Sequence, residues 1–170
     1  MSNDILFTER QRFRQIWVWL MLIGINGLFI WGLIQQDVNG QQWGNKPMSD
    51  NGLFVALGST VLLTILFIVL RLDTEIKQDG IYVRFFPFRL TFRKYSWDKI
   101  AKSFVKQYNP IMDYGGWGIR LGIFGKGRAL NVSGNKGIQI VLTDGTRLLI
   151  GTNKPDEAKQ ALQQVGHLTE

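Results

Sequence analysis

The chain has 170 residues, enough for one modest domain and a few additional elements. It contains no cysteine and a single histidine, His167, which excludes disulfides, thiolate chemistry and cysteine-ligated metal sites and leaves little basis for hydrolytic or metal-dependent catalysis. The formal net charge of +7 favours an anionic partner, which would be nucleic acid or an acidic membrane surface.

Two uncharged apolar runs predict membrane-spanning helices over residues 16–34 and 53–70. Crossing about 30 Å of hydrocarbon takes roughly 20 apolar residues in a helix, and these runs have 19 and 18. A protein of this size cannot surround two such helices with a core of its own, which makes buried core helices the weaker interpretation. The first run also fits a signal peptide, but its length and the lack of an A-x-A-like cleavage site favour a retained anchor.

Small residues near the middle of the two runs predict where the helices approach each other. The amide of Asn26 either hydrogen-bonds across this contact or is a tolerated lone polar group, and the sequence favours neither interpretation. Five small residues are expected to allow a close approach at mid-depth: Gly24, Gly27, Gly58, Ser59 and Thr60.

The distribution of lysine and arginine predicts the orientation of this hairpin. The N-terminal segment, residues 1–15, holds three arginines, the connection over residues 35–52 holds one lysine, and residues 71–170 hold the other 16 basic residues. By the positive-inside rule both termini lie in the cytoplasm and the connection lies outside the cell. We therefore expect a multi-pass protein of the inner (plasma) membrane with a cytoplasmic domain over residues 71–170.

The expected domain consists of short strands joined by tight turns. Runs rich in β-branched and aromatic residues alternate with turn residues, and Asp-Gly pairs at 79–80 and 144–145 are strong hairpin signals. Residues 152–157 read as the start of a helix whose apolar residues follow at helical spacing. The fold class is therefore a membrane α-helical hairpin plus an all-β domain, a bent antiparallel sandwich or open barrel of about seven strands capped by a C-terminal helix.

The stretch YGGWGIR, residues 114–120, combines three glycines with two large aromatic side chains. A phosphate-binding loop joins a strand to a helix and carries a lysine followed by serine or threonine, whereas a strand is expected after this stretch and that signature is missing. We expect the glycines to let the sheet bend, with Trp117 packed inside and Arg120 directed outward. This predicted structural loop comprises Gly115, Gly116, Trp117, Gly118 and Arg120.

Basic residues interleaved with phenylalanines form a candidate binding surface. Over residues 84–106, seven cations accompany a single acid, Asp98. Near an anionic leaflet each cation contributes on the order of 1 kcal/mol, so these residues would orient a domain that the hairpin already anchors. The alternative is an ordinary solvated face, and nucleic acid is an awkward partner for a membrane-fixed domain. This basic strip, expected to meet membrane lipids or a protein partner, comprises Arg84, Arg89, Arg93, Lys94, Lys99, Lys102 and Lys106.

Taken together, these features resemble a family of small bacterial membrane proteins with an N-terminal two-helix hairpin and a cytoplasmic pleckstrin-homology-like (PH-like) domain. The likeness lies in the segments WDKI, YGGWGIR, NVSGNKGIQI, DGTRLLIGT and PDEAKQAL and covers most of residues 72–165. The resemblance implies a bent seven-stranded sheet capped by a C-terminal helix. Most members of the family are uncharacterised, so the resemblance implies no catalytic residues.

The sequence as a whole favours a non-enzymatic binding or scaffolding module for a protein, a peptide or an anionic lipid surface. It shows no nucleophile–base pair, no paired carboxylates and no metal-ligand spacing, so we expect no catalytic residues, no metal and no cofactor. One alternative is an accessory subunit of a larger membrane complex, in which the hairpin with Asn26 packs on other spans. Self-association through the hairpin would add valency. The other alternative is an enzyme with two perturbed titratable groups in one pocket.

Overall fold

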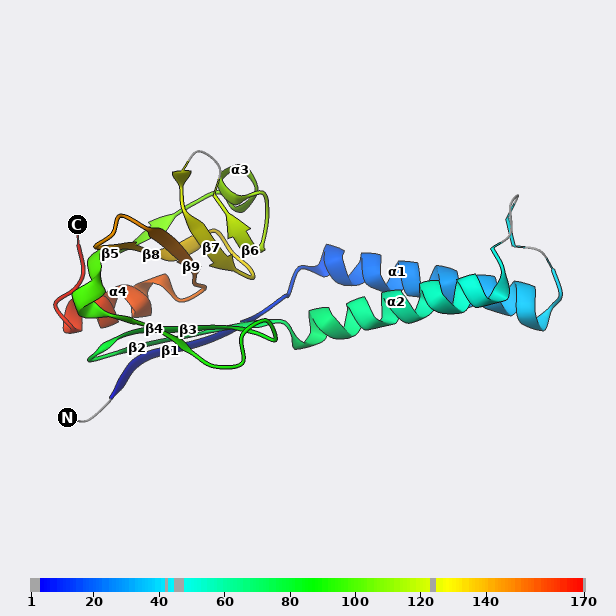
Figure 1. The fold of residues 1–170 in the computed structure, drawn as a ribbon, viewed down its shortest axis with the longest axis horizontal. Coiled ribbons are helices and arrows are strands. Elements are labelled where there is room, and N and C mark those ends of the chain that lie inside the picture. Colours follow the sequence, from blue (N-terminus) through cyan, green and yellow to red (C-terminus); the bar gives the residue numbers. More distant parts are fainter. Residues whose placement is uncertain (1–3, 42, 45–47, 123–124, 170) are drawn as a thin grey trace. The chain divides into compact units, whose positions relative to one another are not determined.

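The chain forms two compact units, Arg14–Val69 and Met1–Phe13 together with Leu70–Glu170 (Figure 1). The second unit therefore contains chain from both sides of the first. The computed structural model describes residues 4–41, 43–44, 48–122 and 125–169.

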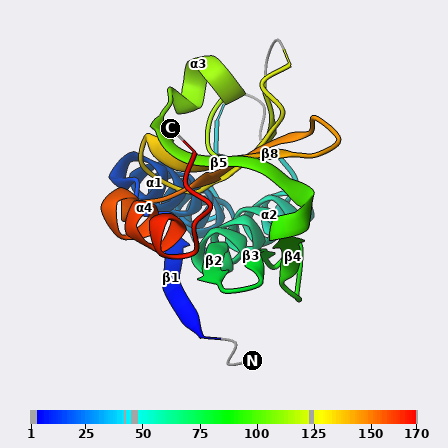
Figure 2. The ribbon, with the colours of Figure 1, turned by 90° about the vertical axis from the view of Figure 1, so that its left-hand side faces the viewer.

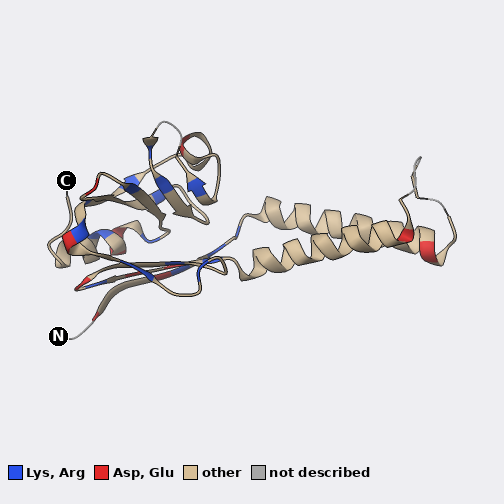
Figure 3. Cartoon of the chain, viewed as in Figure 1, with Lys and Arg blue, Asp and Glu red and all other residues tan. Residues whose placement is uncertain are grey.

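The first unit is a pair of apolar helices. Helix α1 spans Ile16–Leu33 and continues into a π-helical segment, Ile34–Val38, and helix α2 spans Asp50–Val69. With 23 residues in the first continuous helix and 20 in the second, both are long and apolar enough to cross a membrane. Figure 3 shows neither lysine nor arginine on these helices, and acidic residues only beside the connection between them.

The contact between α1 and α2 is polar at its centre. The carboxamide nitrogen of Asn26 donates to Oγ1 of Thr64 (2.9 Å), and the hydroxyl of Thr60 donates to the carboxamide oxygen of Asn26 (3.0 Å). Of the two interpretations that the sequence left open, the interhelical hydrogen bond is confirmed and the lone amide is wrong. Such pairing is favourable because the apolar side chains around these groups offer them no hydrogen-bond partner.

The glycines do not lie at this helix contact, so the expectation that they allow a close approach is wrong. A Cβ atom added at Gly24, Gly27 or Gly58 would meet nothing within 4 Å, which means that each faces away from the partner helix. The hydroxyl of Ser59 donates to the carbonyl of Val55 in its own helix. Of the five small residues, Thr60 therefore makes the interhelical contact, through a hydrogen bond.

The second unit begins with a strand that the sequence did not predict. Strand β1, Ile5–Arg12, pairs antiparallel with β2, Arg71–Lys77, the first strand after the helices. The sheet continues with β3, Gly80–Phe86, and the edge strand β4, Arg93–Ser96, in the order β1-β2-β3-β4. The β domain therefore extends beyond residues 71–170, because residues 5–12 complete its first sheet.

The second sheet has five strands in the order β5-β8-β9-β7-β6. The expectation of an all-antiparallel fold with about seven strands is wrong here, because the described residues form nine strands and β7 pairs with β9 in parallel. β9 pairs antiparallel with β8 on one side and parallel with β7 on the other, so β7 and β9 run in the same direction. The strands and short helices after β4 are a 3₁₀ turn at Trp97–Lys99, β5 at Ile100–Gln107, α3 at Pro110–Tyr114, β6 at Gly118–Leu121, β7 at Arg128–Asn131, β8 at Lys136–Leu142 and β9 at Arg147–Gly151.

The C-terminal helix α4, Pro155–Gln164, closes one end of the space between the sheets, as the sequence predicted. Its apolar face buries Ala158, Ala161 and Leu162, and it contacts strands of both sheets, with β1 and β2 on one side and β5 and β8 on the other. Figure 2 shows α4 and the C-terminus beside β5. Both sheets also contribute fully buried aliphatic residues to the core, among them Leu72 and Ile140.

Strand β1 is joined to the rest of the domain by buried polar contacts. The carboxylate of Glu9 accepts hydrogen bonds from the hydroxyl of Thr152 (2.5 Å) and the backbone N–H of Asn153 (2.8 Å), just before α4. The side chain of Gln11 donates to the carbonyl of Gly151 (2.6 Å) in β9. These contacts make the segment before helix α1 part of the core.

The YGGWGIR stretch has a different role from the predicted one. Its first glycine, Gly115, takes the left-handed conformation (φ 69°) that ends helix α3, which the sequence did not predict. The next aromatic residue, Trp117, is only half-buried and donates through its indole N–H to the carbonyl of Gly134. The buried aromatic residue is Tyr114 instead. Arg120 is exposed, as expected.

Candidate functional site

The seven residues of the basic strip are distributed over both sheets. Arg84 lies on β3, Arg89 in the loop after it, and Arg93 and Lys94 on β4, all in or beside the first sheet. The other three members belong to the region of the second sheet, with Lys99 in the 3₁₀ turn and Lys102 and Lys106 on β5. The sequence placed these seven cations together only because they follow one another along the chain.

Two members of the strip form ion pairs with carboxylates. The guanidinium of Arg84 lies 2.7 Å from the carboxylate of Asp73, which is nearly buried and also pairs with two other arginines, Arg10 and Arg71. The ammonium of Lys94 lies 2.6 Å from the carboxylate of Asp79, and this hydrogen bond raises the pKa of Lys94. Both cations are held by carboxylates of the first sheet, although Asp73 shares its single negative charge among three arginines.

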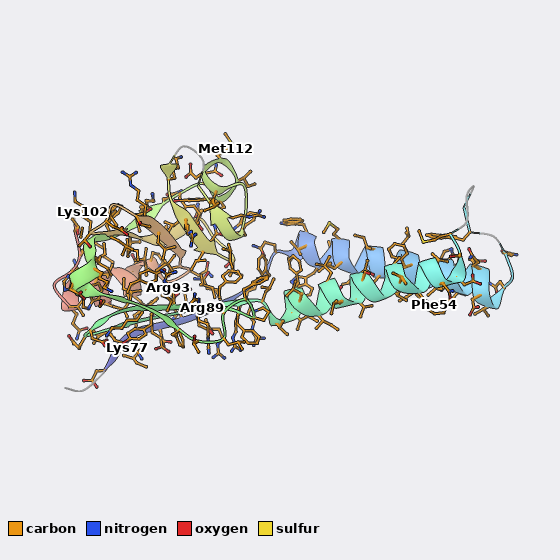
Figure 4. All side chains as sticks on the ribbon, viewed as in Figure 1. Phe54, Lys77, Arg89, Arg93, Lys102 and Met112 are labelled. Carbon is orange, nitrogen blue, oxygen red and sulfur yellow. The ribbon has the colours of Figure 1, made fainter. Side chains whose placement is uncertain are left out.

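The other members that lie near the first sheet, Arg89 and Arg93, line a cleft between the two sheets. This cleft has a volume of about 470 Å³, with β3 and β4 on one side and β6, β7 and β9 on the other. Figure 4 labels Arg89 and Arg93 beside the strands of the first sheet. We call it the arginine cleft, because four of its lining residues are arginines and none is Asp or Glu: Arg89, Arg93, Arg120 and Arg128.

The arginine cleft changes from apolar to cationic between its floor and its rim. Val83, Phe85 and Leu148 are buried and form the floor, whereas all four arginines are exposed. Two apolar side chains of β6 also lie at the rim, with Ile119 51% and Leu121 73% exposed. The cleft is therefore amphipathic, with cationic side chains near solvent and apolar side chains towards the core.

The arginines of the cleft carry positive charge that the protein itself does not compensate. Among the described residues, no carboxylate lies within ion-pair distance of any of the four. Burial raises the pKa of the Tyr95 phenol, and the charges of Arg93, Arg89 and Arg128 oppose this rise. The guanidinium of Arg93 lies 5.1 Å from the centre of the Tyr95 ring. Tyr95 thus reports a positive potential at this site.

A second basic hollow lies on the second sheet. It has a volume of about 530 Å³ and is lined by Lys102, Lys106, Lys126 and Arg147, together with Asp113. Burial lowers the pKa of Lys106, and the neighbouring Lys126 and Arg147 lower it further while Asp113 opposes them. The carboxylate of Asp113 lies 2.5 Å from the ammonium of Lys126, so this hollow already holds a counter-ion. The arginine cleft is the better candidate for an anion site because it holds none.

In the part of the chain that the structure describes, two groups with perturbed pKa values line the second basic hollow: burial lowers the pKa of Lys106, and the hydrogen bond from Lys126 lowers the pKa of Asp113. The enzyme alternative therefore stays a prediction. No three His, Cys, Asp or Glu side chains in the described ranges lie close enough together to hold a metal ion. The imidazole of His167 stacks on Trp97, with ring centres 4.4 Å apart, and the hydroxyl of Ser103 donates to the backbone carbonyl of His167. Both side chains hold the C-terminal segment against β5.

Sequence reasoning found three of the four arginines in the cleft but did not bring them together. Arg89 and Arg93 were assigned to the basic strip and Arg120 to the glycine-rich loop, while Arg128 was not identified. Arg128 begins β7 in the segment GKGRALN, where its only signal is a cation next to an apolar strand. The cleft exists because β6 and β7 pair and face β3 and β4, and no local pattern encodes that arrangement.

Comparisons of the chain with protein-family models, with curated proteins and with solved structures find no match. The PH-like resemblance therefore stays a prediction. The function has to be argued from the residues of the cleft and from the path of the chain.

Proposed function

We propose that this protein is an integral membrane protein whose β domain is a non-enzymatic binding module for anionic ligands at the membrane surface. The arginine cleft is the proposed binding site. The observation that carries the proposal is that four exposed arginines line an apolar cleft whose lining contains no carboxylate.

The path of the chain supports a membrane hairpin. Strand β1 precedes the helices and β2 follows them, and the two strands pair with Arg12 opposite Arg71. Both ends of the helical segment must therefore lie on the same side of a membrane, which two spans achieve and one does not. Cleavage of the first helix as a signal peptide would also separate β1 from the domain that it completes. With the positive-inside rule, this path favours a cytoplasmic domain in the plasma membrane.

The chemistry of arginine supports an anionic ligand. A guanidinium offers planar, bidentate hydrogen bonding that matches carboxylate and phosphate groups, and it stays charged under all physiological conditions. Four such groups without a counter-ion repel one another, and a bound anion relieves this repulsion. Anionic phospholipid is the ligand that a membrane-anchored domain meets at the highest local concentration.

Binding of a water-soluble anionic lipid to the full-length protein tests this proposal. In dodecyl maltoside, we expect dihexanoyl phosphatidylglycerol to bind and dihexanoyl phosphatidylcholine to bind much more weakly. The double variant Arg89→Gln/Arg128→Gln removes two cations from the cleft and should weaken binding roughly thirtyfold, at about 1 kcal/mol for each charge. The dissociation constants can be measured by microscale thermophoresis.

A variant with the same loss of charge elsewhere serves as the control. Lys99→Gln/Lys102→Gln removes two exposed cations that do not line the cleft. Its affinity for the anionic lipid should stay within about twofold of the original. Equal binding of the two lipids, or an equal loss of affinity in both double variants, would show that the cleft is not the binding site.

An accessory subunit of a membrane complex is the weaker proposal. It relied on Asn26 as a polar contact to other spans, but the carboxamide of Asn26 bonds to Thr60 and Thr64 within the hairpin. A protein partner would therefore have to meet the hairpin through its apolar surface. Purification from membranes with a stoichiometric second protein would favour this alternative.

A further inference from the structure

We infer that the arginine cleft holds one anionic membrane lipid, with one of its acyl chains in the space between the sheets and its acidic headgroup at the arginines. This inference rests on the proposed function and goes further, because surface attraction requires only the charges. It assigns a separate role to the apolar floor of the cleft.

The floor of the cleft provides the argument for an acyl chain. Val83, Phe85 and Leu148 are at most 4% exposed, and Leu130 from β7 adds a half-buried aliphatic wall. An inorganic anion or a headgroup alone gains nothing from such a surface, because its oxygens need hydrogen-bond donors. An acyl chain gains about 0.8 kcal/mol for each methylene group that it buries there.

The positions of the arginines provide the argument for an acidic headgroup at the rim. Arg89 and Arg93 line the cleft from the first sheet, and Arg120 and Arg128 line it from the second, so arginines lie on both sides of it. All four are exposed, so a headgroup bound to them would keep its remaining contacts with water. A ligand with an apolar tail and a negative headgroup therefore matches the apolar floor with its tail and the cationic rim with its headgroup.

An acidic peptide is the other ligand with apolar and negative groups, and the cleft suits it less well. A peptide held at a sheet edge obtains its affinity from backbone hydrogen bonds along the edge strand. The edge strands at the cleft, β4 and β6, have only four residues each. A bilayer lipid needs no such strand, and the membrane anchor brings it to the domain at high concentration.

Photo-cross-linking of the full-length protein in nanodiscs tests this inference. The nanodiscs consist of phosphatidylcholine with a minor share of phosphatidylglycerol that carries a diazirine at the end of one acyl chain. After illumination and digestion, mass spectrometry should find the lipid on peptides from β3, β7 or β9 as well as on α1 and α2. The helices serve as an internal control, because any span in a bilayer is labelled by such a probe.

Two variants show whether the label comes from the cleft. Arg89→Gln/Arg128→Gln should reduce labelling of the strands at least fivefold and leave labelling of the helices unchanged, whereas Lys99→Gln/Lys102→Gln should change neither. Leu130→Trp fills the hollow but keeps every arginine, and it should also abolish labelling of the strands. A thermal melt of each variant establishes whether it is folded. If Leu130→Trp does not fold, the arginine variant alone tests the inference.

The possible outcomes separate this inference from the proposed function. Binding of short-chain phosphatidylglycerol through the arginines without any label on the strands would overturn the inference and leave the function in place. Loss of both signals would overturn both. A third outcome is that the strands carry no label and that a peptide of alternating Glu and Leu binds in a way that depends on the cleft arginines. This outcome would overturn the lipid inference and identify an acidic peptide as the occupant.

Discussion

At the scale of single residues, Tyr95 is the natural reporter of the arginine cleft. Burial raises the pKa of its phenol, and the nearby charges of Arg93, Arg89 and Arg128 lower it. Because these charges stabilise the phenolate, their removal must raise the pKa of Tyr95 further. An anion bound among the arginines would have the same effect, since it cancels part of the positive potential.

We therefore predict a higher pKa for Tyr95 in Arg89→Gln/Arg128→Gln than in the original protein. The titration can be followed by NMR with tyrosine labelled at the ring carbon that bears the hydroxyl, and Tyr95→Phe assigns the signal. Lys99→Gln/Lys102→Gln should leave this pKa within about 0.2 of the original, because neither lysine contributes to its shift. An unchanged or lower pKa in the arginine variant would mean that the guanidiniums do not act on the cleft as described.

The sequence alone could identify single cations but not their partners. Arg84 and Arg93 look alike in the sequence, yet Arg84 pairs with Asp73 eleven residues away, whereas Arg93 lies beside Tyr95 with no carboxylate at ion-pair distance among the described residues. The difference arises from strand register, since Asp73 and Arg84 are directly opposite each other in β2 and β3. Free charge is therefore a property of pairing, which only the folded domain reveals.

At the scale of elements, the segments with strong local signals were predicted correctly. The two apolar helices, the Asp-Gly hairpins and the amphipathic helix α4 each follow from periodicity and turn residues within one short stretch. Strand β1 was missed because only one of its three buried side chains, Phe7, is apolar. The other two, Glu9 and Gln11, are polar, so the sequence shows no alternation of apolar and polar residues. Helix α3 has only five residues, too few for a helical repeat to show.

The helix pair makes its own prediction about stability. Asn26→Leu removes both interhelical hydrogen bonds and should lower the stability of the helix pair by about 1 kcal/mol, because such bonds are worth little more than that in bilayers. Gly58→Leu adds a side chain of the same size on the open face and should be close to neutral. Unfolding of the detergent-solubilised protein in sodium dodecyl sulfate, followed by circular dichroism, measures both. A larger loss for Gly58→Leu would place the helix contact on the glycine face.

At the scale of the whole molecule, the β domain is built from two separate pieces of chain. Strand β1 comes before the helices and supplies Glu9 and Gln11 to the core, while the remaining strands come after the helices. The boundary that the sequence predicted at residue 71 follows the end of the second apolar run. The sequence could not show that the domain begins earlier, because residues 5–12 are recognisable as part of it only from the pairing of β1 with β2.

This arrangement predicts how the domain can be isolated. Arg12 and Arg71 face each other as the last pair of β1 and β2. An Asn-Gly turn in place of residues 14–69 should extend this register by one pair, Phe13 and Leu70, and join the strands as an ordinary two-residue hairpin. We expect this shortened protein to be soluble, monomeric and cooperatively folded. A fragment of residues 71–170 lacks β1 and should melt at a much lower temperature or aggregate. Thermal circular dichroism and gel filtration compare the two, and equal stability would contradict the role given to β1.

The measurement that tests the account most directly is the location of introduced cysteines relative to the membrane. The chain has no cysteine of its own, so Thr8→Cys on β1, Asn39→Cys after α1 and Lys159→Cys on α4 each provide a single thiol. In intact bacterial cells, a membrane-impermeant maleimide should label Asn39→Cys and should label the other two only after permeabilisation. Labelling of Thr8→Cys and Lys159→Cys from opposite sides, or of all three from the same side, would contradict a membrane hairpin inserted between two paired strands.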